Sequence, residues 1–269
     1  MAAVSGTRIA ISWIQETFWF LFLIVQLPFL FFSKWGSPGR RRERVLILTD
    51  HACSTVFYFG LRSALKRRGF PVTVLGIGQL TSLTTQARTL ARLLEELDVQ
   101  RGILIAHGKA GLAALALPDS ARRRVQHLVT LGTPFHGSRV FLPLAVVPSF
   151  GDMSVGSEFL LLHRMNALLF PQFSPFCAFQ DQLIYPSNLG HFGQGRDLIL
   201  DRSGHWNLVL DAENIDTIVQ HLLQAHPEPA QAAPGVAAAI PSKATATPKK
   251  AEPRKSAPAA RKAKPRKRR

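Results

Sequence analysis

The sequence predicts an α/β protein in which helices cover both faces of a doubly wound, mostly parallel sheet. Short apolar runs typical of buried strands alternate with segments of helical spacing over residues 44–226, and this alternation is typical of parallel sheets. One run, Ile103–Ile105, passes through small residues directly into a helical pattern. Hydrophobic residues make up 46% of the 269 residues, which is enough to build a substantial core.

The elements follow from these patterns in chain order. The apolar runs predict strands at Val45–Leu48, Val72–Ile77, Ile103–Ile105, His127–Leu131, Phe176–Gln180 and Leu198–Leu200. Helical spacing predicts helices at Phe57–Arg68, Ser82–Val99, from the turn after Ile105 to Leu117, and at Asp211–Ala225. The segment Phe135–Pro175 is apolar and broken by prolines, with helical spacing over Glu158–Leu169.

The N-terminal segment Ile9–Ser33 is apolar and aromatic, and its second half carries no charge. A stretch of this length spans a bilayer if Glu16 lies near one interface, and Pro28 makes a re-entrant path an alternative. A cleaved signal peptide is disfavoured, because only Arg8 precedes the segment and no small-x-small cleavage site precedes Lys34. A helix buried inside a soluble protein is disfavoured by phenylalanines that would point in all directions.

The charges that flank this segment predict its orientation. Residues 1–8 form a short flank with one arginine, whereas a basic linker, residues 34–43, follows the segment. Positive residues favour the cytoplasmic side, so we expect the folded domain and the C-terminus to face the cytoplasm. Cys53 and Cys177 lie in apolar surroundings and suggest a reducing compartment more than a disulfide. The basic residues after the segment are Lys34, Arg40, Arg41, Arg42 and Arg44.

The turn after Ile105 has small residues, Ala106 and Ala110, two positions before and two after its centre. Such residues are needed where the backbones of a strand and the following helix nearly touch. The centre itself is Gly108, which carries no hydroxyl, thiol or carboxylate. Taken alone, the motif is explained better by a generic strand–glycine–helix turn, because short glycine motifs are weak signals.

The downstream sequence changes this interpretation. His127–Ser138 runs from a strand into Gly-Thr-Pro-Phe-His-Gly-Ser. Together with the turn, it resembles the bacterial triacylglycerol-lipase branch of the α/β-hydrolases, in which an elbow of the type Leu-Ile-Gly-His-Ser-x-Gly-Gly-Leu precedes such a strand. Further matches are Gly156–Leu160 with Met165–Ala167, Asp181 with Ile184, Pro186 and Ser187, and Gly204 with His205. The resemblance covers about residues 44–225 and implies an α/β-hydrolase fold with residues 135–175 as a cap.

The resemblance also implies a site in which nucleophile, acid and histidine follow one another along the chain. Asp181 matches the acid and His205 the histidine, but Gly108 occupies the nucleophile's position. Asp50 stands where the oxyanion loop of the family has glycine, and Lys109 follows the nucleophile position, so both are expected on the oxyanion side. Two alternatives stay open: Asp50 lies in an ordinary surface loop, and Asp181 and His205 persist only as a structural pair.

Other nucleophiles are scarce. Thr49, Cys53 and Ser54 are the nearby hydroxyl and thiol residues, and none of them lies on the elbow. Ser154 superficially resembles a nucleophile within its motif, but it does not follow a predicted strand and belongs to the cap.

The composition changes at Pro227, and residues 227–269 consist mostly of Ala, Pro, Lys and Arg, which predicts disorder. Lys243–Arg269 contains 12 of the 33 basic residues and one of the 17 acidic residues, so it carries +11 of the net charge of +16. We expect this tail to bind polyanions without sequence preference, either anionic lipid or nucleic acid, with a solubilising role as the alternative. The expected binding residues are Lys249, Lys250, Arg254, Lys255, Arg261, Lys262, Lys264, Arg266, Lys267, Arg268 and Arg269.

The sequence therefore predicts a membrane-anchored, lipase-like pseudoenzyme that acts by binding or tethering. An apolar ligand in the hydrolase pocket is a further expectation, and neither a cofactor nor a metal ion is expected. The alternative is an active lipid or ester hydrolase that uses a non-standard nucleophile or an activated water. Gly108 favours the first hypothesis, because losing a triad nucleophile lowers the rate by several orders of magnitude.

Overall fold

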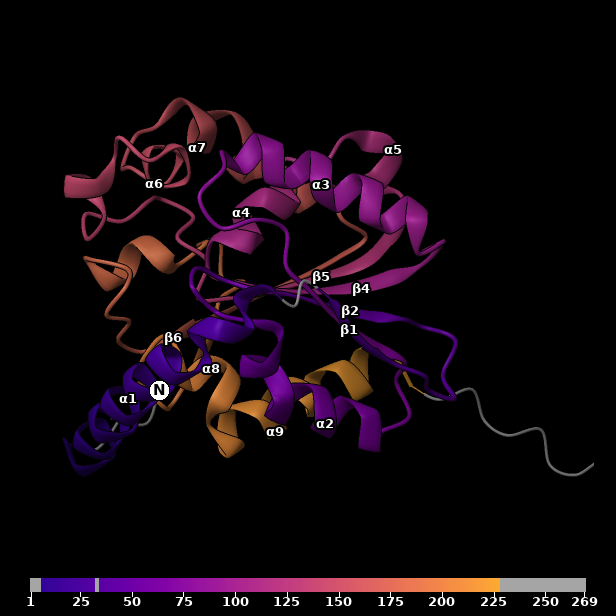
Figure 1. The fold of residues 1–269 in the computed structure, drawn as a ribbon, viewed down its shortest axis with the longest axis horizontal. Helices are drawn as coiled ribbons and strands as arrows, with labels where there is room; N and C mark the ends of the chain where they lie inside the picture. The colour runs from indigo at the N-terminus through magenta and orange to yellow at the C-terminus, as the bar shows by residue number, and fades with distance from the viewer. Residues whose placement is uncertain (1–5, 32–33, 228–269) are drawn as a thin grey trace, which may run out of the picture. The chain divides into compact units, whose positions relative to one another are not determined.

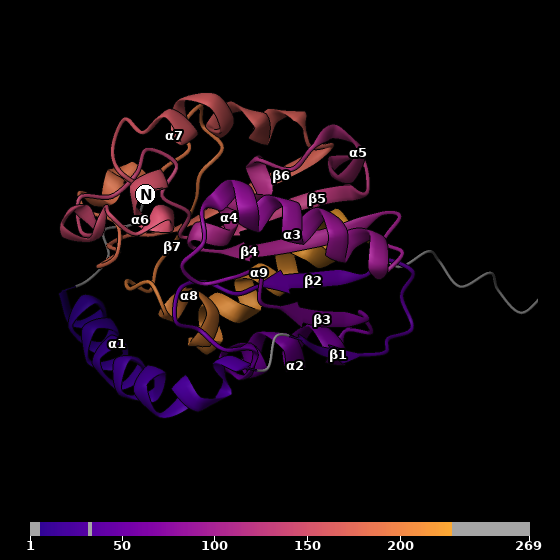
Figure 2. The same cartoon turned by 45° about the horizontal axis from the view of Figure 1, so that its top comes forward.

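A computed structural model describes residues 6–31 and 34–227 of the chain. The predicted polyanion-binding residues of the tail lie outside the described residues. Within them, seven strands form one sheet in the order β1-β3-β2-β4-β5-β6-β7 (Figure 2). The strands are β1 Lys34–Ser37, β2 Val45–Leu48, β3 Val72–Leu75, β4 Gly102–His107, β5 Val125–Leu131, β6 Gln172–Ala178 and β7 Leu198–Leu200.

The sheet is parallel from β3 to β7, and β1 alone pairs antiparallel with β3. The predicted doubly wound, mostly parallel sheet is therefore confirmed. The edge strand β1 was not expected, because its four residues lie at the start of the predicted basic linker. Trp35 on this strand packs under the guanidinium of Arg62, whose Cζ lies 3.9 Å from the ring centroid.

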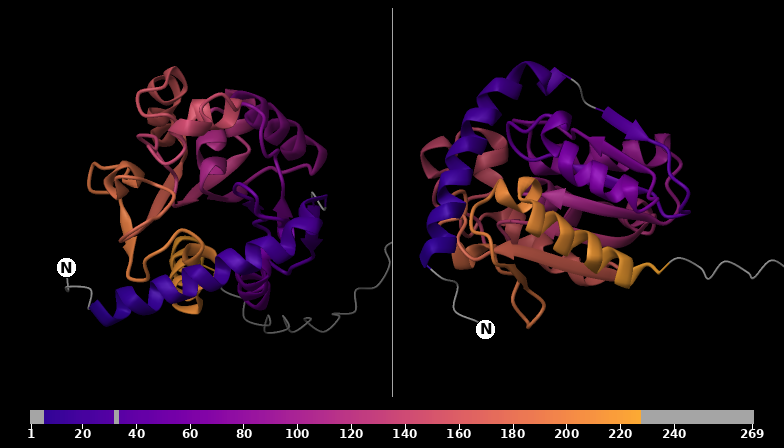
Figure 3. Two further views of the ribbon diagram at one scale, coloured as in Figure 1. Left: turned by 60° about the vertical axis from the view of Figure 1, so that its left-hand side comes forward. Right: turned by 90° about the horizontal axis from the view of Figure 1, so that it is seen from below.

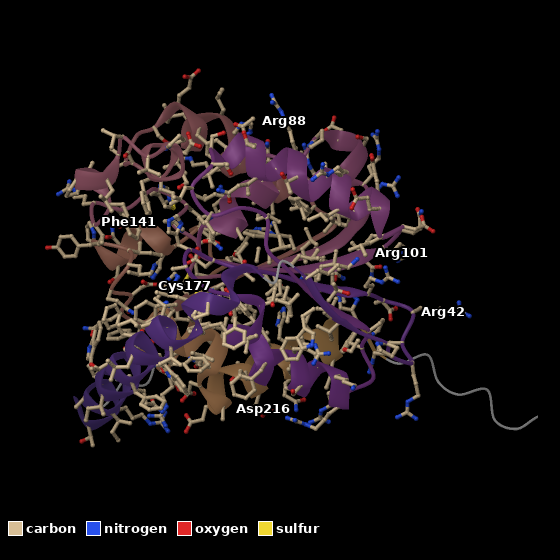
Figure 4. The ribbon with its side chains drawn as sticks, in the orientation of Figure 1. Arg42, Arg88, Arg101, Phe141, Cys177 and Asp216 are labelled. Atoms are coloured by element: carbon tan, nitrogen blue, oxygen red, sulfur yellow. The ribbon has the colours of Figure 1, made fainter. Side chains whose placement is uncertain are left out.

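Helices cover both faces of the sheet (Figure 1). One face carries α3 Leu83–Glu96, α4 Lys109–Leu115 and α5 Asp119–Arg122, and the other carries α2 Phe59–Arg67, α8 Asn207–Leu210 and α9 Ala212–Ala225. Alternate residues of β2 enter the two cores, with Leu46 and Leu48 on the α3 side and Val45 and Ile47 on the α9 side. Figure 4 marks these two faces by Arg88 on α3 and Asp216 on α9.

The remaining elements lie before the sheet and in the predicted cap. The N-terminal segment forms α1 Gly6–Gln26 followed by the 3₁₀ turn η1 Leu27–Phe31. The cap segment contains η3 Leu142–Leu144, α6 Pro148–Asp152, α7 Glu158–His163 and η4 Arg164–Leu169. Two short 3₁₀ turns, η2 Thr55–Tyr58 and η5 Ser187–Gly190, complete the set of elements in the described residues.

The strand β6 begins at Gln172, four residues before the predicted start at Phe176. Pro175 lies inside the strand, opposite Thr130 of β5. A proline cannot donate to the ladder and is unusual away from a sheet edge, so the sequence pattern places the boundary after it. The segment predicted as a cap therefore overlaps the strand by four residues, Gln172–Pro175.

Candidate functional site

The turn between β4 and α4 has the geometry of a sharp strand-to-helix elbow. Gly108 lies between the last residue of β4 and the first residue of α4, with φ +52° and ψ −125°. Its N–H donates to the Leu131 carbonyl at 2.8 Å, and the Thr133 hydroxyl donates to its carbonyl at 2.9 Å. Glycine adopts a positive φ without the strain that a side chain would introduce.

The two residues that match the acid and the histidine lie next to this elbow. Asp181 follows β6, and His205 lies in the loop between β7 and α8. The His205 Nδ1 lies 2.7 Å from the Asp181 Oδ2, and both side chains are buried. The Leu183 N–H donates to the Asp181 Oδ1 at 2.8 Å and helps to hold this carboxylate in place.

Asp50 brings a second carboxylate to His205, from the loop after β2. Its Oδ2 lies 3.0 Å from the His205 Nε2, and its Oδ1 accepts the Lys109 backbone N–H at 2.9 Å. The side chain is buried, so the alternative of an ordinary surface loop is excluded. A Cβ built on Gly108 would overlap the carboxyl group of Asp50. The Asp50 carboxylate therefore occupies the space of the side chain that Gly108 lacks.

This arrangement holds an imidazolium between two carboxylates. Burial alone would lower the pKa of His205, but the charges and hydrogen bonds of Asp181 and Asp50 outweigh it and raise the pKa well above its ordinary value. Burial alone would raise the pKa of Asp50, but the hydrogen bond and charge of His205 keep it below its ordinary value. A histidine that stays protonated at neutral pH cannot accept a nucleophile's proton.

Lys109 contributes its backbone, not its ammonium group, to this side of the site. Its Nζ donates to the Gly78 carbonyl at 2.7 Å and to the Gln86 Oε1 at 3.0 Å, and the side chain is fully buried. Burial lowers the pKa of Lys109 to about 8. Its N–H is the group that would face an oxyanion, and Asp50 already engages it.

Two further residues of the site, Tyr58 and His107, escaped the sequence reasoning. The Tyr58 hydroxyl accepts the Asp50 backbone N–H at 2.8 Å and lies 2.9 Å from the His107 Nδ1. The His107 Nε2 lies 3.1 Å from the His205 carbonyl, and the two imidazole rings stack at 4.5 Å. A polar residue that ends an otherwise apolar strand was the available signal for His107.

The protonation states of His107 and Tyr58 follow from their burial and their hydrogen-bond partners. Burial lowers the pKa of His107 to about 4, so the ring is neutral at pH 7. It donates from Nε2 and accepts the Tyr58 hydroxyl proton at Nδ1. Asp50, His107 and His205 bring ligand atoms within 4.8 Å of one another. Because the imidazole nitrogens already have protein partners, this donor set does not fit a metal ion well.

The cavity beside the elbow is small, and Phe141 and Met153 of the predicted cap segment are among the residues that line it. Its volume is about 20 Å³, which is room for about one water molecule. Phe141 and Phe150 of the cap stack at 4.8 Å, and the latter packs at 4.4 Å against His51. Burial and the charge of Lys109 lower the pKa of His51 to about 4. Figure 4 shows Phe141 at the end of the sheet where the cap lies.

The other nucleophile candidates are poorly placed for catalysis. Cys53 is buried in the core on the α9 side, and burial together with the charge of Asp50 raises the pKa of its thiol well above the ordinary value. Ser154 lies in the cap, where its hydroxyl donates to the Phe150 carbonyl at 3.3 Å. Both cysteines are free and buried, as the sequence suggested.

Comparison with known proteins identifies the fold. No protein-family model matches the chain, and no curated protein matches it by sequence. Aspergillus fumigatus lipase B is similar in structure at 15% identity and a TM-score of 0.58, over 71% of this chain and 56% of that chain. The mature Bacillus licheniformis lipase BlEst2 is similar at 16% identity and a TM-score of 0.55, over 71% and 97%.

An enol-lactonase from Burkholderia xenovorans LB400 is similar as well, at 14% identity and a TM-score of 0.52, over 71% of this chain and 95% of that chain. The chain spans just over half the length of the Aspergillus lipase. At these identities the likeness concerns the fold alone.

Proposed function

We propose that this chain, which has the α/β-hydrolase fold, is a membrane-attached protein that has lost acyl-transfer chemistry and acts by binding. The observation that supports this most is the position of Asp50. Its carboxylate fills the space of the missing nucleophile side chain and engages both His205 and the Lys109 N–H. The base, His205, and the oxyanion donor, the Lys109 N–H, are thus both bound by Asp50. The remaining cavity of about 20 Å³ leaves no room for an ester substrate.

The proposal is tested with the detergent-solubilised full chain. A fluorophosphonate probe of serine hydrolases is expected to leave the protein unlabelled, and short-chain nitrophenyl esters are expected to turn over no faster than with the His205→Ala variant. Labelling at any serine, or turnover that disappears in His205→Ala, would contradict the proposal.

The second candidate function is a carboxylic-ester or lipid hydrolase with a non-standard nucleophile. The observation that favours it is again Asp50, whose carboxylate lies at the nucleophile's position and within 3.0 Å of His205. This candidate predicts turnover that is lost in Asp50→Asn as well as in His205→Ala while both variants keep their fold. Turnover without dependence on Asp50 would indicate an activated water or a different side chain as the attacking group.

The partners are part of the proposal. The apolar N-terminal helix α1 is long and apolar enough to cross a membrane, although a signal sequence passes the same test. We propose that it attaches the chain to a membrane, with the domain on the cytoplasmic side because the basic residues follow the helix. The polybasic residues 243–269 then supply a second contact, to phosphate groups of lipid or nucleic acid, and an apolar ligand would bind where the cap opens.

A further inference from the structure

In the helix α1, three polar side chains face the protein, and the face toward the outside is mostly apolar, with Thr17 as an exposed polar residue. Ser12, Glu16 and Gln26 are at most 3% exposed. The outer face carries large apolar residues that are 37–71% exposed: Ile11, Trp13, Ile14, Phe18, Phe20, Leu21, Ile24 and Val25. A surface helix in water has the opposite arrangement, with polar residues outward. This arrangement suits a helix whose outer face meets an apolar medium.

Most of the inward polar groups dock α1 on the domain, whereas the Ser12 hydroxyl donates to the Arg8 carbonyl within the helix. Glu16 accepts the backbone N–H groups of Trp206 and Asn207 and the side-chain amide of Gln182. The Asn207 Nδ2 donates to the Ser12 carbonyl at 3.0 Å. Figure 3 shows α1 lying along the α8 side of the domain.

The far end of the helix is fastened in the same way. The Gln26 Oε1 accepts the Ser54 N–H at 2.7 Å, and its Nε2 donates to the Ala52 carbonyl at 2.6 Å. Near the middle, the Trp19 indole donates to the Asn207 Oδ1 at 2.9 Å. The docked part from Ser12 to Gln26 corresponds to about 21 Å of helix. The domain thus follows the helix over most of the distance that a membrane-spanning segment would need.

We infer that α1 lies in the plane of the membrane, with its outer face in the boundary between lipid headgroups and acyl chains, and does not cross the bilayer. A crossing helix would carry Ala52, Gln182 and Asn207, with their loops, to hydrocarbon depth. Backbone of that kind is not tolerated against lipid. This inference rests on the proposed membrane attachment and specifies its geometry. A helix in the membrane plane has both flanks on one side, so with this geometry the flanking charges no longer determine on which side the domain lies.

The composition of the outer face identifies lipid as the occupant. Between residues 9 and 29 Glu16 is the only charged residue, and it faces the protein. Arg8 precedes this stretch and Lys34 follows it, which suits anionic headgroups at both ends of an in-plane helix. Exposed Trp and Phe side chains on the same face are typical of the membrane interface.

The docking also connects the membrane helix to the candidate site. Gln182 accepts the His205 N–H at 2.8 Å through its Oε1 and donates to Glu16 through its Nε2. Gly204 leaves space for Glu16, because a Cβ at this position would overlap the Glu16 side chain. The loops that carry Asp181 and His205 therefore lie directly against the membrane helix, and the site lies beside the bilayer surface.

The test measures the depth of α1 in vesicles of three parts phosphatidylcholine to one part phosphatidylglycerol. The full chain receives single spin labels at Ile14→Cys, Phe18→Cys, Leu21→Cys and Val25→Cys, with Arg88→Cys on α3 as the aqueous control. The native thiols are at most 3% exposed, and unmodified protein checks that they stay unlabelled. Accessibility to oxygen and to a nickel chelate gives the depth of each label.

We expect all four labels at one shallow depth and the control in water. An impermeant maleimide is expected to reach Thr7→Cys and Arg88→Cys from the same side of the vesicle. A crossing helix would instead separate Ile14 and Val25 by about 16 Å in depth, which would overturn the in-plane geometry but leave the attachment intact. Protein that does not float with vesicles would overturn both, and spin–spin broadening between chains would show that a second copy covers the face.

Discussion

At the scale of single residues, a side chain at position 108 and the Asp50 carboxylate would compete for the same volume, so glycine at 108 and the carboxylate at 50 are explained together. A side chain at position 108 would meet the Asp50 carboxyl group and would also be held at positive φ. The Asp50 carboxylate, in turn, can reach His205 and the Lys109 N–H only because position 108 is empty beyond its Cα. The absence of a side chain at position 108 and the inward position of the Asp50 carboxylate therefore depend on each other.

Gly108→Ala is expected to lower the free energy of unfolding by about 2–5 kcal/mol, from backbone strain and overpacking together. Gly156→Ala is the matched control, because Gly156 also has a positive φ, of +77°, but nothing lies within 4 Å of its added Cβ. Urea unfolding in mild detergent measures both variants. Equal losses in the two would mean that Asp50 does not fill the space beside Gly108.

The ionisation of His205 is expected to be visible by NMR of labelled imidazoles. Because the pKa of His205 is raised, its signals should remain those of an imidazolium above pH 7. The His107 ring should remain neutral as the pH is lowered to about 5. Asp50→Asn removes an anion and should lower the pKa of His205. A His205 that titrates near its ordinary value in the unchanged protein would contradict the ion triad.

The same shifts give the sign of the pH dependence of stability. A raised pKa of His205 stabilises the fold below about pH 6.5, and this contribution is lost as the pH rises through the folded value. A lowered pKa of Asp50 stabilises the fold above about pH 4, and this contribution is lost as the pH falls through the folded value. The destabilisation caused by Asp50→Asn should thus be largest between about pH 4 and 6.5.

The sequence could predict the positions of Gly108, Asp181 and His205 because they occur in the order of a motif series and follow strands. It left the position of Asp50 open between an oxyanion loop and the surface. Asp50 and His205 are 155 residues apart, and whether a short loop turns inward depends on tertiary neighbours such as the Tyr58 hydroxyl. Local sequence patterns do not contain that information.

At the scale of elements, the structure of α1 gives information that its composition does not. Its apolar composition predicts a membrane segment, and the structure adds that its polar residues form a stripe docked on the domain. Sequence spacing does place Ser12, Glu16, Trp19 and Gln26 on one helical face. It does not tell whether that face meets lipid, a second helix or the domain, because the partners of Glu16 lie more than 160 residues away.

Glu16→Ala is expected to lower the free energy of unfolding by about 2–4 kcal/mol, because it leaves the buried N–H groups of Trp206 and Asn207 without an acceptor. Glu16→Gln keeps an acceptor oxygen and should lower the free energy of unfolding by less. Thr17→Ala, at an exposed position of the same helix, is the matched control. Unfolding followed by tryptophan fluorescence measures all three, and an unaffected Glu16→Ala variant would mean that α1 is not docked in solution.

At the scale of the whole molecule, charge and apolar surface are divided between the two ends of the chain. The apolar surface of α1 precedes the domain, and +11 of the net charge of +16 lies in residues 243–269. Both features suit attachment to an anionic surface, one through acyl chains and the other through phosphates. The remaining chain carries only +5, so charge-driven binding should depend on the tail.

Deleting residues 243–269 is expected to abolish most binding to DNA duplexes of unrelated sequence and to leave the melting temperature of the domain nearly unchanged. Each phosphate that the tail neutralises should contribute about −0.9 to the log–log slope of affinity against salt. Competition at fixed ionic strength and matched phosphate concentration between duplex and vesicles with anionic lipid identifies the preferred polyanion. If neither binds the intact chain, the tail has only a solubilising role.

The most direct test of the central claim, that Asp50 has taken the nucleophile's place and thereby silenced the site, is labelling of the double variant Asp50→Gly, Gly108→Ser by a fluorophosphonate probe. Removing the carboxylate frees His205 and the Lys109 N–H, and the new hydroxyl enters the vacated space. We expect labelling at position 108, lost again with His205→Ala, and ester turnover about 10²-fold or more above the unchanged protein. Gly108→Ser alone should stay unlabelled because Asp50 still holds the base. A folded double variant that neither labels nor turns over ester would contradict the account.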